Sequence, residues 1–218
     1  MTSRIDLRVL PMGEEALLVE VADTAQVMAL AAVLRALVEA EEGPFGAVVD
    51  LVPAARTVLL HAATGTDLGA LATAVESVAA RTPAVPGADD DEDRVEIAVA
   101  YGGSDLAEVA RLVGLTEREV VRAHTGSTWR VAFCGFAPGF GYLVDGDPRL
   151  RVPRHPAPRS TVPAGSVALA GEFSAVYPRS SPGGWQLIGS TEMVLWDLDR
   201  SPPALLRPGR AVRFVEEP

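Results

Sequence analysis

The feature that most constrains this 218-residue chain is the segment PAVPGADDDED at residues 83–93. Two prolines, a glycine and five consecutive acidic residues cannot pack a core, so the segment predicts a solvated linker. The charge also changes across it, because residues 1–93 hold 5 arginines against 16 acidic residues, whereas residues 94–218 hold 14 against 13. We therefore expect two domains, at 1–82 and 94–218, and we expect any site for an anion in the second.

The first domain alternates strand and helix patterns. Apolar periodicity and turn residues predict strands at 5–10, 16–21, 47–52 and 57–62. One helix is expected from residue 23 or 24 to a stop at Gly43–Pro44, and a second at 67–81. This ββαββα order predicts a small open sheet with helices on one face. His61 lies in an apolar strand, and we expect it in the core.

The second domain begins with a predicted strand at 95–101 and two short helices. Their first residues have capping-box spacing, Asp105 with Glu108 and Thr116 with Glu119. After His124, short β-forming runs separated by glycine and proline predict a closed or partly closed barrel. Acidic residues at the start of the second helix would repel phosphate, which argues against a DNA-binding helix-turn-helix.

Composition narrows the classes of function. All 19 basic residues are arginine, which excludes chemistry that needs a lysine, such as a Schiff base or a phosphate-loop lysine. The net charge of −10 disfavours nucleic acid and anionic membrane as partners. The longest apolar run, at 27–34, is far below the roughly 20 residues that span a bilayer, and the first twenty residues lack a signal-peptide pattern. With a single cysteine, Cys134, the chain is expected to be cytoplasmic.

Residues 133–191 are dense in glycine, proline, arginine and aromatic residues. The segment 149–171 contains no acid, and its basic side chains are Arg149, Arg151, Arg154, His155 and Arg159. Guanidinium groups suit a bidentate grip on carboxylate or phosphate, so an anion site is one interpretation. The other is that these arginines pair with the acidic first domain, and the residues alone leave both open.

Several strings in this chain resemble one family along its whole length. They are VEIAVAYGGSDLAEVA (95–110), GFAPGFGYL (135–143), PRHPAPRSTVPAGSVALAG (153–171), YP (177–178) and SPGGWQLIGST (181–191), together with His124. The family is that of allophanate hydrolase subunit 1, also described as the carboxyltransferase C/D subdomain family or as the family of the B-type subunit of 5-oxoprolinase. The resemblance implies an α+β protein, with a small N-terminal α/β sandwich domain followed by a cyclophilin-like β-barrel domain.

The same resemblance implies a function. It indicates one subunit of an ATP-dependent amidohydrolase, of the 5-oxoprolinase or allophanate hydrolase type, that opens a small anionic amide. ATP with Mg²⁺ would be the cofactor, and the partner would be a homologous second subunit, of the allophanate hydrolase subunit 2 or C-type 5-oxoprolinase kind. The resemblance associates this pair with a third protein in the opening of 5-oxoproline. The alternative is a regulatory protein that inhibits a sensor histidine kinase. No metal site in the chain itself is expected, because three histidines and one cysteine lack ligand spacing.

Candidate site residues follow from the motifs and the resemblance together. His124 is the candidate acid or base, titrating near neutrality, with capping of the preceding helix as its alternative. Arg154 and Arg159 are expected to bind the anion. Further contacts with substrate are expected from Gly135, Phe136, Pro138, Gly139, Phe140, Tyr142, Gly165, Ser166, Tyr177, Gly183, Gly184, Trp185 and Thr191. Phe136, Phe140 and Tyr142 are also candidates for contact with the second subunit, whereas His155 is expected in a surface loop and Cys134 is not expected to act as a nucleophile.

The chain departs from the family in three places, one of which is the YGGSDL turn at 101–106, shorter than the usual form. Glu172 and Phe173 begin a stretch where the family reads Gly-Gln-Thr-Gly-Ile, and Ser190 replaces an arginine before Thr191. These departures leave the expected fold unchanged, and they leave open which amide is used and whether turnover is retained.

Overall fold

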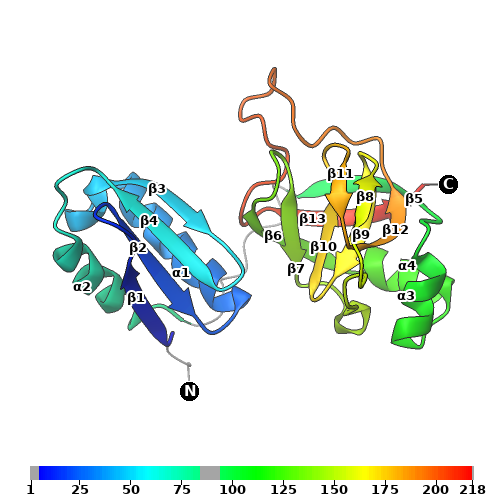
Figure 1. Cartoon of the computed structure of the whole chain (residues 1–218), viewed down its shortest axis with the longest axis horizontal. Helices are drawn as coiled ribbons and strands as arrows, with labels where there is room; N and C mark the ends of the chain where they lie inside the picture. Colours follow the sequence, from blue (N-terminus) through cyan, green and yellow to red (C-terminus); the bar gives the residue numbers. More distant parts are fainter. Residues whose placement is uncertain (1–4, 84–93, 218) are drawn as a thin grey trace. The chain divides into compact units, whose positions relative to one another are not determined.

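The computed structural model describes residues 5–83 and 94–217, which fall into two compact units (Figure 1). The division lies within the segment 83–93. Apart from Pro83, that segment is outside the described residues, so its character as a linker stays a prediction. No helix in the described ranges is long and apolar enough to cross a membrane.

The first unit is a four-stranded antiparallel sheet with two helices. The strand order is β1-β2-β4-β3, with bounds Leu7–Pro11, Ala16–Val21, Thr57–Ala62 and Val48–Pro53 respectively. Helix α1 spans Thr24–Glu39, α2 spans Leu68–Ala79, and the short 3-10 helix η1 spans Gly43–Ala47. The inward side chains of the sheet and both helices share one hydrophobic core. The predicted order of strands and helices is therefore confirmed.

Two expectations for this unit are wrong. Helix α1 ends at Glu39, and the left-handed residue after it is Glu41, with φ +51°, while the Glu42 N–H donates to the Leu37 carbonyl. Gly43 and Pro44 begin η1 instead of capping α1. His61 is not in the core, because its neighbours on β4 face the helices and its own side chain is 49% exposed on the open face.

The second unit contains a closed seven-stranded barrel, as expected. Its strand order is β10-β7-β6-β13-β5-β12-β9, where β13 runs parallel to β5 and every other pair is antiparallel. The bounds in that order are Phe173–Val176, Gly141–Val144, Thr128–Cys134, Ala211–Glu216, Val95–Tyr101, Gln186–Ser190 and Ser166–Ala170. Helices α3 (Leu106–Val113) and α4 (Glu117–Thr125) contribute to the barrel core, and η3 spans Pro148–Leu150.

The two helix starts in this unit differ. Thr116 and Glu119 form the predicted capping box at α4, with reciprocal side-chain to backbone hydrogen bonds. Asp105 precedes α3 but makes no capping hydrogen bond, so the expected second capping box is absent. Its carboxylate instead bonds groups far along the chain, at Arg159 and Leu187.

A small two-stranded sheet lies beside the barrel (Figure 1). It pairs β8 (Arg159–Val162) with β11 (Ser181–Gly183). On β9, Val167 and Leu169 belong to the barrel core, so the alternate residues Ala168 and Ala170 face outward. These alanines pack in a separate cluster with Val162 of β8 and with large aromatic side chains. The second unit therefore has two cores, one inside the barrel and one on its outer face.

Candidate functional site

The outer core of the second unit is an aromatic cluster. We give this name to seven side chains, Phe133, Phe136, Phe140, Tyr142, Phe173, Tyr177 and Trp185. Phe140 lies at its centre, with ring centroids 5.3 Å from Tyr177 and 5.6 Å from Trp185 in edge-to-face geometry. Phe140, Tyr177 and Trp185 are buried, whereas Phe136 is 59% exposed. The cluster thus joins a rigid aromatic base to one exposed ring.

The turn between β6 and β7 places Phe136 and Phe140. Phe136 has φ +68° and Gly139 has φ +82°, and the Phe140 N–H donates to the Ala137 carbonyl at 3.0 Å. A left-handed conformation is unfavourable for a bulky residue, so the surrounding contacts must hold Phe136 in place. Its ring packs edge-to-face on Phe140 and Tyr177. The turn buries Phe140 and exposes Phe136 to solvent. Contact of either residue with a substrate or a second subunit stays a prediction.

Gly183 has a packing role that fixes Tyr177. A Cβ atom at position 183 would lie 2.3 Å from the Tyr177 hydroxyl. A Cβ atom at the neighbouring Gly184 would lie 3.7 Å from Pro158, an ordinary van der Waals distance. The Gly184 carbonyl accepts a hydrogen bond from the His155 N–H at 2.7 Å. The two glycines therefore hold β11 and the loop before β8 close to the aromatic cluster.

Arg154 lies against the indole of Trp185. The distance from its Cζ atom to the ring centroid is 5.8 Å, within the range of a cation–π interaction. Burial raises the pKa of Tyr142 and of Tyr177, while the Arg154 guanidinium acts in the opposite direction at both phenols. Arg154 is exposed and forms no ion pair with any carboxylate in the described ranges. A guanidinium and two protonated phenols therefore stand together beside the indole.

Arg159 is held by a buried carboxylate. Its Nη2 atom donates to Asp105 Oδ1 at 2.6 Å, and Asp105 Oδ2 accepts from the Leu187 N–H at 2.7 Å. His155 Nε2 lies 3.3 Å from the same Oδ1, without the geometry of a hydrogen bond. Asp105 is buried, with 5% exposed, and both of its carboxylate oxygens are engaged in these hydrogen bonds. For this reason its side chain does not cap the start of α3. His155 lies in a loop with exposed neighbours, as expected, but its own side chain is half-buried beside this pair.

Sequence reasoning missed Asp105 as part of the site. A signal was present, because four arginines in an acid-free segment require counter-charges from elsewhere in the chain. For three of the four, the structure supplies a counter-charge from within the second unit. Arg149 pairs with Asp147, Arg151 with Glu172 at 3.2 Å, and Arg159 with Asp105. For these three arginines, the alternative of pairing with the acidic first domain is therefore wrong.

His124 is separated from the aromatic cluster by the barrel wall. It is fully buried in the barrel, where Nδ1 lies 2.7 Å from the Tyr101 hydroxyl and Nε2 lies 2.9 Å from Ser174 Oγ. Its ring stacks on Phe214 at 4.2 Å. Burial lowers the pKa of His124 from 6.5 to about 3. The expectation that it titrates near neutrality is wrong, and so is the alternative of a cationic helix cap.

Three other expected contact residues form a turn of their own. A Cβ atom at Gly165 would lie 2.2 Å from the Thr191 carbonyl, and the Thr191 N–H donates to the Gly165 carbonyl. The Ser166 hydroxyl donates to the Pro163 carbonyl at 2.8 Å, and Thr191 Oγ1 accepts from the Met193 N–H. Ser166 and Thr191 are buried, so these residues act in packing here.

The departures from the family pattern fall near the cluster. Glu172 is exposed and paired with Arg151, whereas Phe173 is half-buried and packs edge-to-face on Phe133 and Tyr142. Ser190 ends β12 and is exposed. Phe173 thus extends the aromatic cluster, which the family glycine and amide would not do.

The Cys134 thiol lies 3.5 Å from the Leu206 carbonyl, to which it donates.

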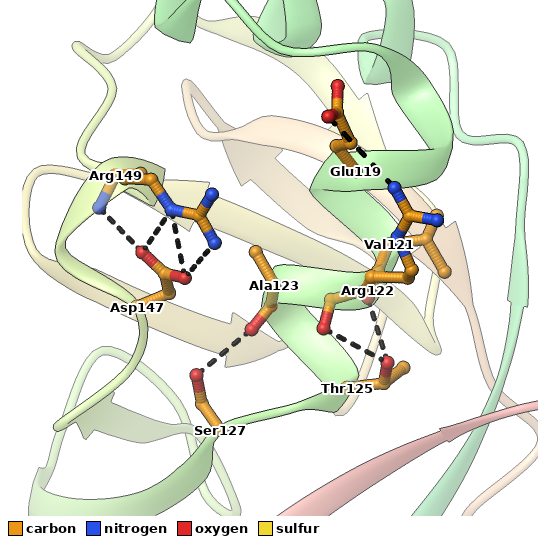
Figure 2. A network of polar contacts seen from close by, with 8 residues as sticks. All are labelled: Glu119, Val121, Arg122, Ala123, Thr125, Ser127, Asp147 and Arg149. Atoms are coloured by element: carbon orange, nitrogen blue, oxygen red, sulfur yellow. Dashed lines mark hydrogen bonds and ion pairs between the residues drawn. The ribbon is translucent and has the colours of Figure 1, made fainter.

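A second polar region lies at the end of α4 (Figure 2). It surrounds a hollow of about 340 Å³ lined by Glu119, Arg122, Ala123, Gly126, Ser127, Asp147 and Arg149. Each of its arginines already faces an acid, Arg122 toward Glu119 at 4.0 Å and Arg149 toward Asp147. The Ser127 hydroxyl donates to the Ala123 carbonyl and thereby satisfies the end of the helix. We interpret this region as a helix terminus and prefer the aromatic cluster as the site.

Metal ligands are not gathered at either place. Within the described ranges, no three His, Cys, Asp or Glu side chains lie close enough to hold an ion. What the cluster offers a ligand is the Arg154 guanidinium, phenol hydroxyls and aromatic faces. This set can hold a small, flat, anionic molecule.

The chain is similar to known proteins in both sequence and fold. Residues 7–206 match the family described as carboxyltransferase domain, subdomain C and D. The B-type subunit of 5-oxoprolinase from Escherichia coli O157:H7 is 50% identical over 126 residues, which are 56% of this chain and 58% of that protein. The B-type subunit of 5-oxoprolinase from Bacillus subtilis (strain 168) is 48% identical over 124 residues, 56% of this chain and 52% of that protein.

A solved structure extends the comparison to nearly the whole chain. The crystal structure of TTHA0988 matches 98% of this chain with a TM-score of 0.71 and 37% identity, but the match covers only 40% of that protein. The chain also matches little more than half the length of the two 5-oxoprolinase subunits. The match therefore covers only part of each of these proteins.

Proposed function

This chain belongs to the family of the carboxyltransferase domain, subdomain C and D, and we propose that it is one subunit of an ATP-dependent amidohydrolase. The substrate would be a small anionic amide such as 5-oxoproline, which hydrolysis would open to glutamate. The relatives named as 5-oxoprolinase subunits support this assignment over allophanate hydrolase. The companion would be a homologous second subunit, of the C-type 5-oxoprolinase kind.

The observation that carries the proposal is Arg154 on Trp185 beside two phenols. The guanidinium suits the carboxylate of the substrate, because planar ion pairs of this kind are bidentate. The flat ring of a cyclic amide suits the aromatic faces, and the protonated hydroxyl of the half-buried Tyr142 can donate to its carbonyl oxygen. Asp105 would keep Arg159 in place at the edge of this site.

The companion would complete the chemistry. In the aromatic cluster and its arginines, the described side chains supply binding groups but no paired nucleophile and base. We place ATP at the assembled enzyme, where arginines of this cluster could face its phosphates and Mg²⁺ would arrive with the nucleotide. Substrate binding by this chain and activation by the pair would then be separable.

Reconstitution tests the proposal. The chain, its companion and their mixture are each supplied with the third protein of the system, 5-oxoproline, Mg²⁺ and ATP, and glutamate and ADP are measured. We expect both products from the mixture only, in equal amounts, and no glutamate when ATP is omitted. Full turnover by the isolated chain, or none by the mixture, would contradict the proposal.

A further inference from the structure

The connection between β12 and β13 forms an arm that projects from the barrel. We use this name for residues 193–205, drawn in orange in Figure 1, where they rise beyond the barrel strands. The Leu205 N–H donates to the Leu195 carbonyl, and the Asp197 N–H donates to the Pro203 carbonyl, so the two sides of the arm are paired. Long connections of this kind within a compact domain are usually functional.

Arginine and aspartate side chains hold the arm in one shape. Arg200 donates to the Val194 carbonyl at 3.1 Å, and the Asp197 carboxylate accepts from the Asp199 N–H at 3.0 Å. At its base, Leu195 is 2% exposed and belongs to the barrel core. The arm is therefore ordered before any partner binds, which lowers the entropy lost on binding.

The ordered arm presents apolar side chains to solvent. Within the described ranges, ten large hydrophobic side chains are exposed, and four of them lie in residues 193–198 of the arm. The exposed fractions are 37% for Met193, 56% for Val194, 40% for Trp196 and 80% for Leu198. The turn that carries Phe136 packs against its base, because a Cβ at Gly139 would lie 3.0 Å from Trp196 Cβ. Phe136 adds a fifth exposed apolar side chain next to the arm. Such a concentration marks an interaction surface.

We infer that the arm, with Phe136, is the surface on which the companion subunit docks, an inference that rests on the proposed function. The arm is convex, which suits insertion into an apolar groove of another protein and not the binding of a small molecule. Its Asp197 and Asp199 and the chain's net charge of −10 disfavour an anionic lipid surface and a second copy. The relatives are named as subunits, and TTHA0988 carries more polypeptide beyond the matched part.

This surface revises the sequence-based expectation for contact with the second subunit. Of the three candidates, Phe136 is exposed, but Phe140 is buried in the aromatic cluster and Tyr142 is half-buried there. Trp196 replaces them as the expected centre of the contact, because buried tryptophans dominate the affinity of many interfaces.

Binding between the chain and the companion tests the inference. The variants are Trp196→Ala and Leu198→Ser. The controls are Met12→Ala and Val49→Ser, which remove apolar groups of intermediate exposure, 51% and 61%, from the first unit. We expect Kd for the companion to rise about 30-fold with Trp196→Ala and to stay unchanged in both controls. Thermal denaturation should show unchanged Tm for Leu198→Ser, whose side chain is 80% exposed, so that its loss of binding is not a loss of folding.

The outcomes separate this inference from the proposed function. Equal Kd for wild type and both arm variants, or no binding of the companion by wild type, would overturn the inference. Binding of wild type to phosphatidylglycerol vesicles or to itself through Trp196, in place of the companion, would also overturn it. If the arm variants lose binding but the wild-type pair forms no glutamate, the docking surface stands and the proposed activity fails.

Discussion

At the scale of single residues, His124 shows how burial decides chemistry. Both ring nitrogens lie within hydrogen-bond distance of a partner, Tyr101 on one side and Ser174 on the other, and no part of the residue is exposed. A neutral imidazole has one donor and one acceptor, and this site uses both. The residue therefore stabilises the barrel and does not exchange protons with substrate.

The pH dependence of unfolding follows from this burial. The pKa of His124 is about 3 in the fold against 6.5 when exposed, so below pH 6.5 the unfolded chain binds a proton that the folded chain does not. Stability from this residue is complete above pH 6.5 and is lost as pH falls toward 3, by at most about 1.4 kcal/mol per pH unit. The free energy of unfolding, measured by urea denaturation between pH 5 and 6.5, should change less steeply with pH in His124→Gln than in wild type. An unchanged slope there, or an equal change in the exposed control His61→Gln, would contradict this account.

Asp105 is the residue whose role the sequence conceals. An aspartate before a helix is normally an N-cap, but this carboxylate bonds Arg159 and the Leu187 N–H. Asp105→Ser retains a good N-cap residue, yet it removes both acceptors. We expect it to lower the free energy of unfolding by about 2–4 kcal/mol.

The matched change at the other helix isolates this effect. Thr116→Ser keeps a hydroxyl in the capping box of α4 and should change stability by less than about 0.5 kcal/mol. Both variants are measured by urea denaturation at neutral pH. A neutral effect of Asp105→Ser would show that its side chain serves only the helix start.

At the scale of elements, the positions of the strands were predictable from the sequence. Which side chains of a strand face the barrel core, and which face the outer core, was not. The pattern predicted β2, β4 and β5 closely, because apolar and polar residues alternate or flanking turns mark the ends. β9 reads SVALA and is buried throughout, so no alternation shows that Ala168 and Ala170 face a second core. Register shifts in β6 and β12 hide the facing further.

Adjacent glycines at the end of β11 offer a test of the aromatic packing. Gly183→Ala would place a methyl group against the Tyr177 hydroxyl, and Tyr177 is only 1% exposed and cannot move aside. Overpacking of this kind costs about 1–3 kcal/mol. Gly184→Ala meets only ordinary contacts and should change Tm little.

Differential scanning calorimetry of both glycine variants measures this difference in Tm. We expect a fall in Tm for Gly183→Ala and a loss of affinity for substrate in the assembled enzyme, because Tyr177 supports Trp185 through Phe140. Equal Tm for the two variants would show that the outer core tolerates an added methyl group and is not closely packed.

At the scale of the whole molecule, the chain is two units with different charge and different architecture. The proline and acidic residues of segment 83–93 indicated the division, and the glycine-rich motifs indicated a barrel. Closure of the barrel was not predictable in detail, because it depends on parallel pairing of β13 with β5, from opposite ends of the second unit. The aromatic part of the site was expected, whereas Asp105, Phe133 and the arm were found only in the structure.

The central claim is that the aromatic cluster binds an anionic amide through Arg154. Arg154 is the more informative variant because it is exposed, whereas Arg159 is tied to Asp105 and its replacement would also disturb the fold. A lysine at 154 keeps the charge but loses the planar fork and the contact with Trp185. Arg151→Lys is the matched control, since Arg151 is exposed and pairs with Glu172.

Isothermal titration of 5-oxoproline into the assembled enzyme, in the presence of Mg²⁺ and a non-hydrolysable ATP analogue, tests this claim most directly. For Arg154→Lys we expect affinity to fall about tenfold, which corresponds to the loss of one charge-assisted hydrogen bond. Arg151→Lys should bind as tightly as wild type. Equal affinities for wild type and Arg154→Lys would contradict the account and assign Arg154 to the solvated surface.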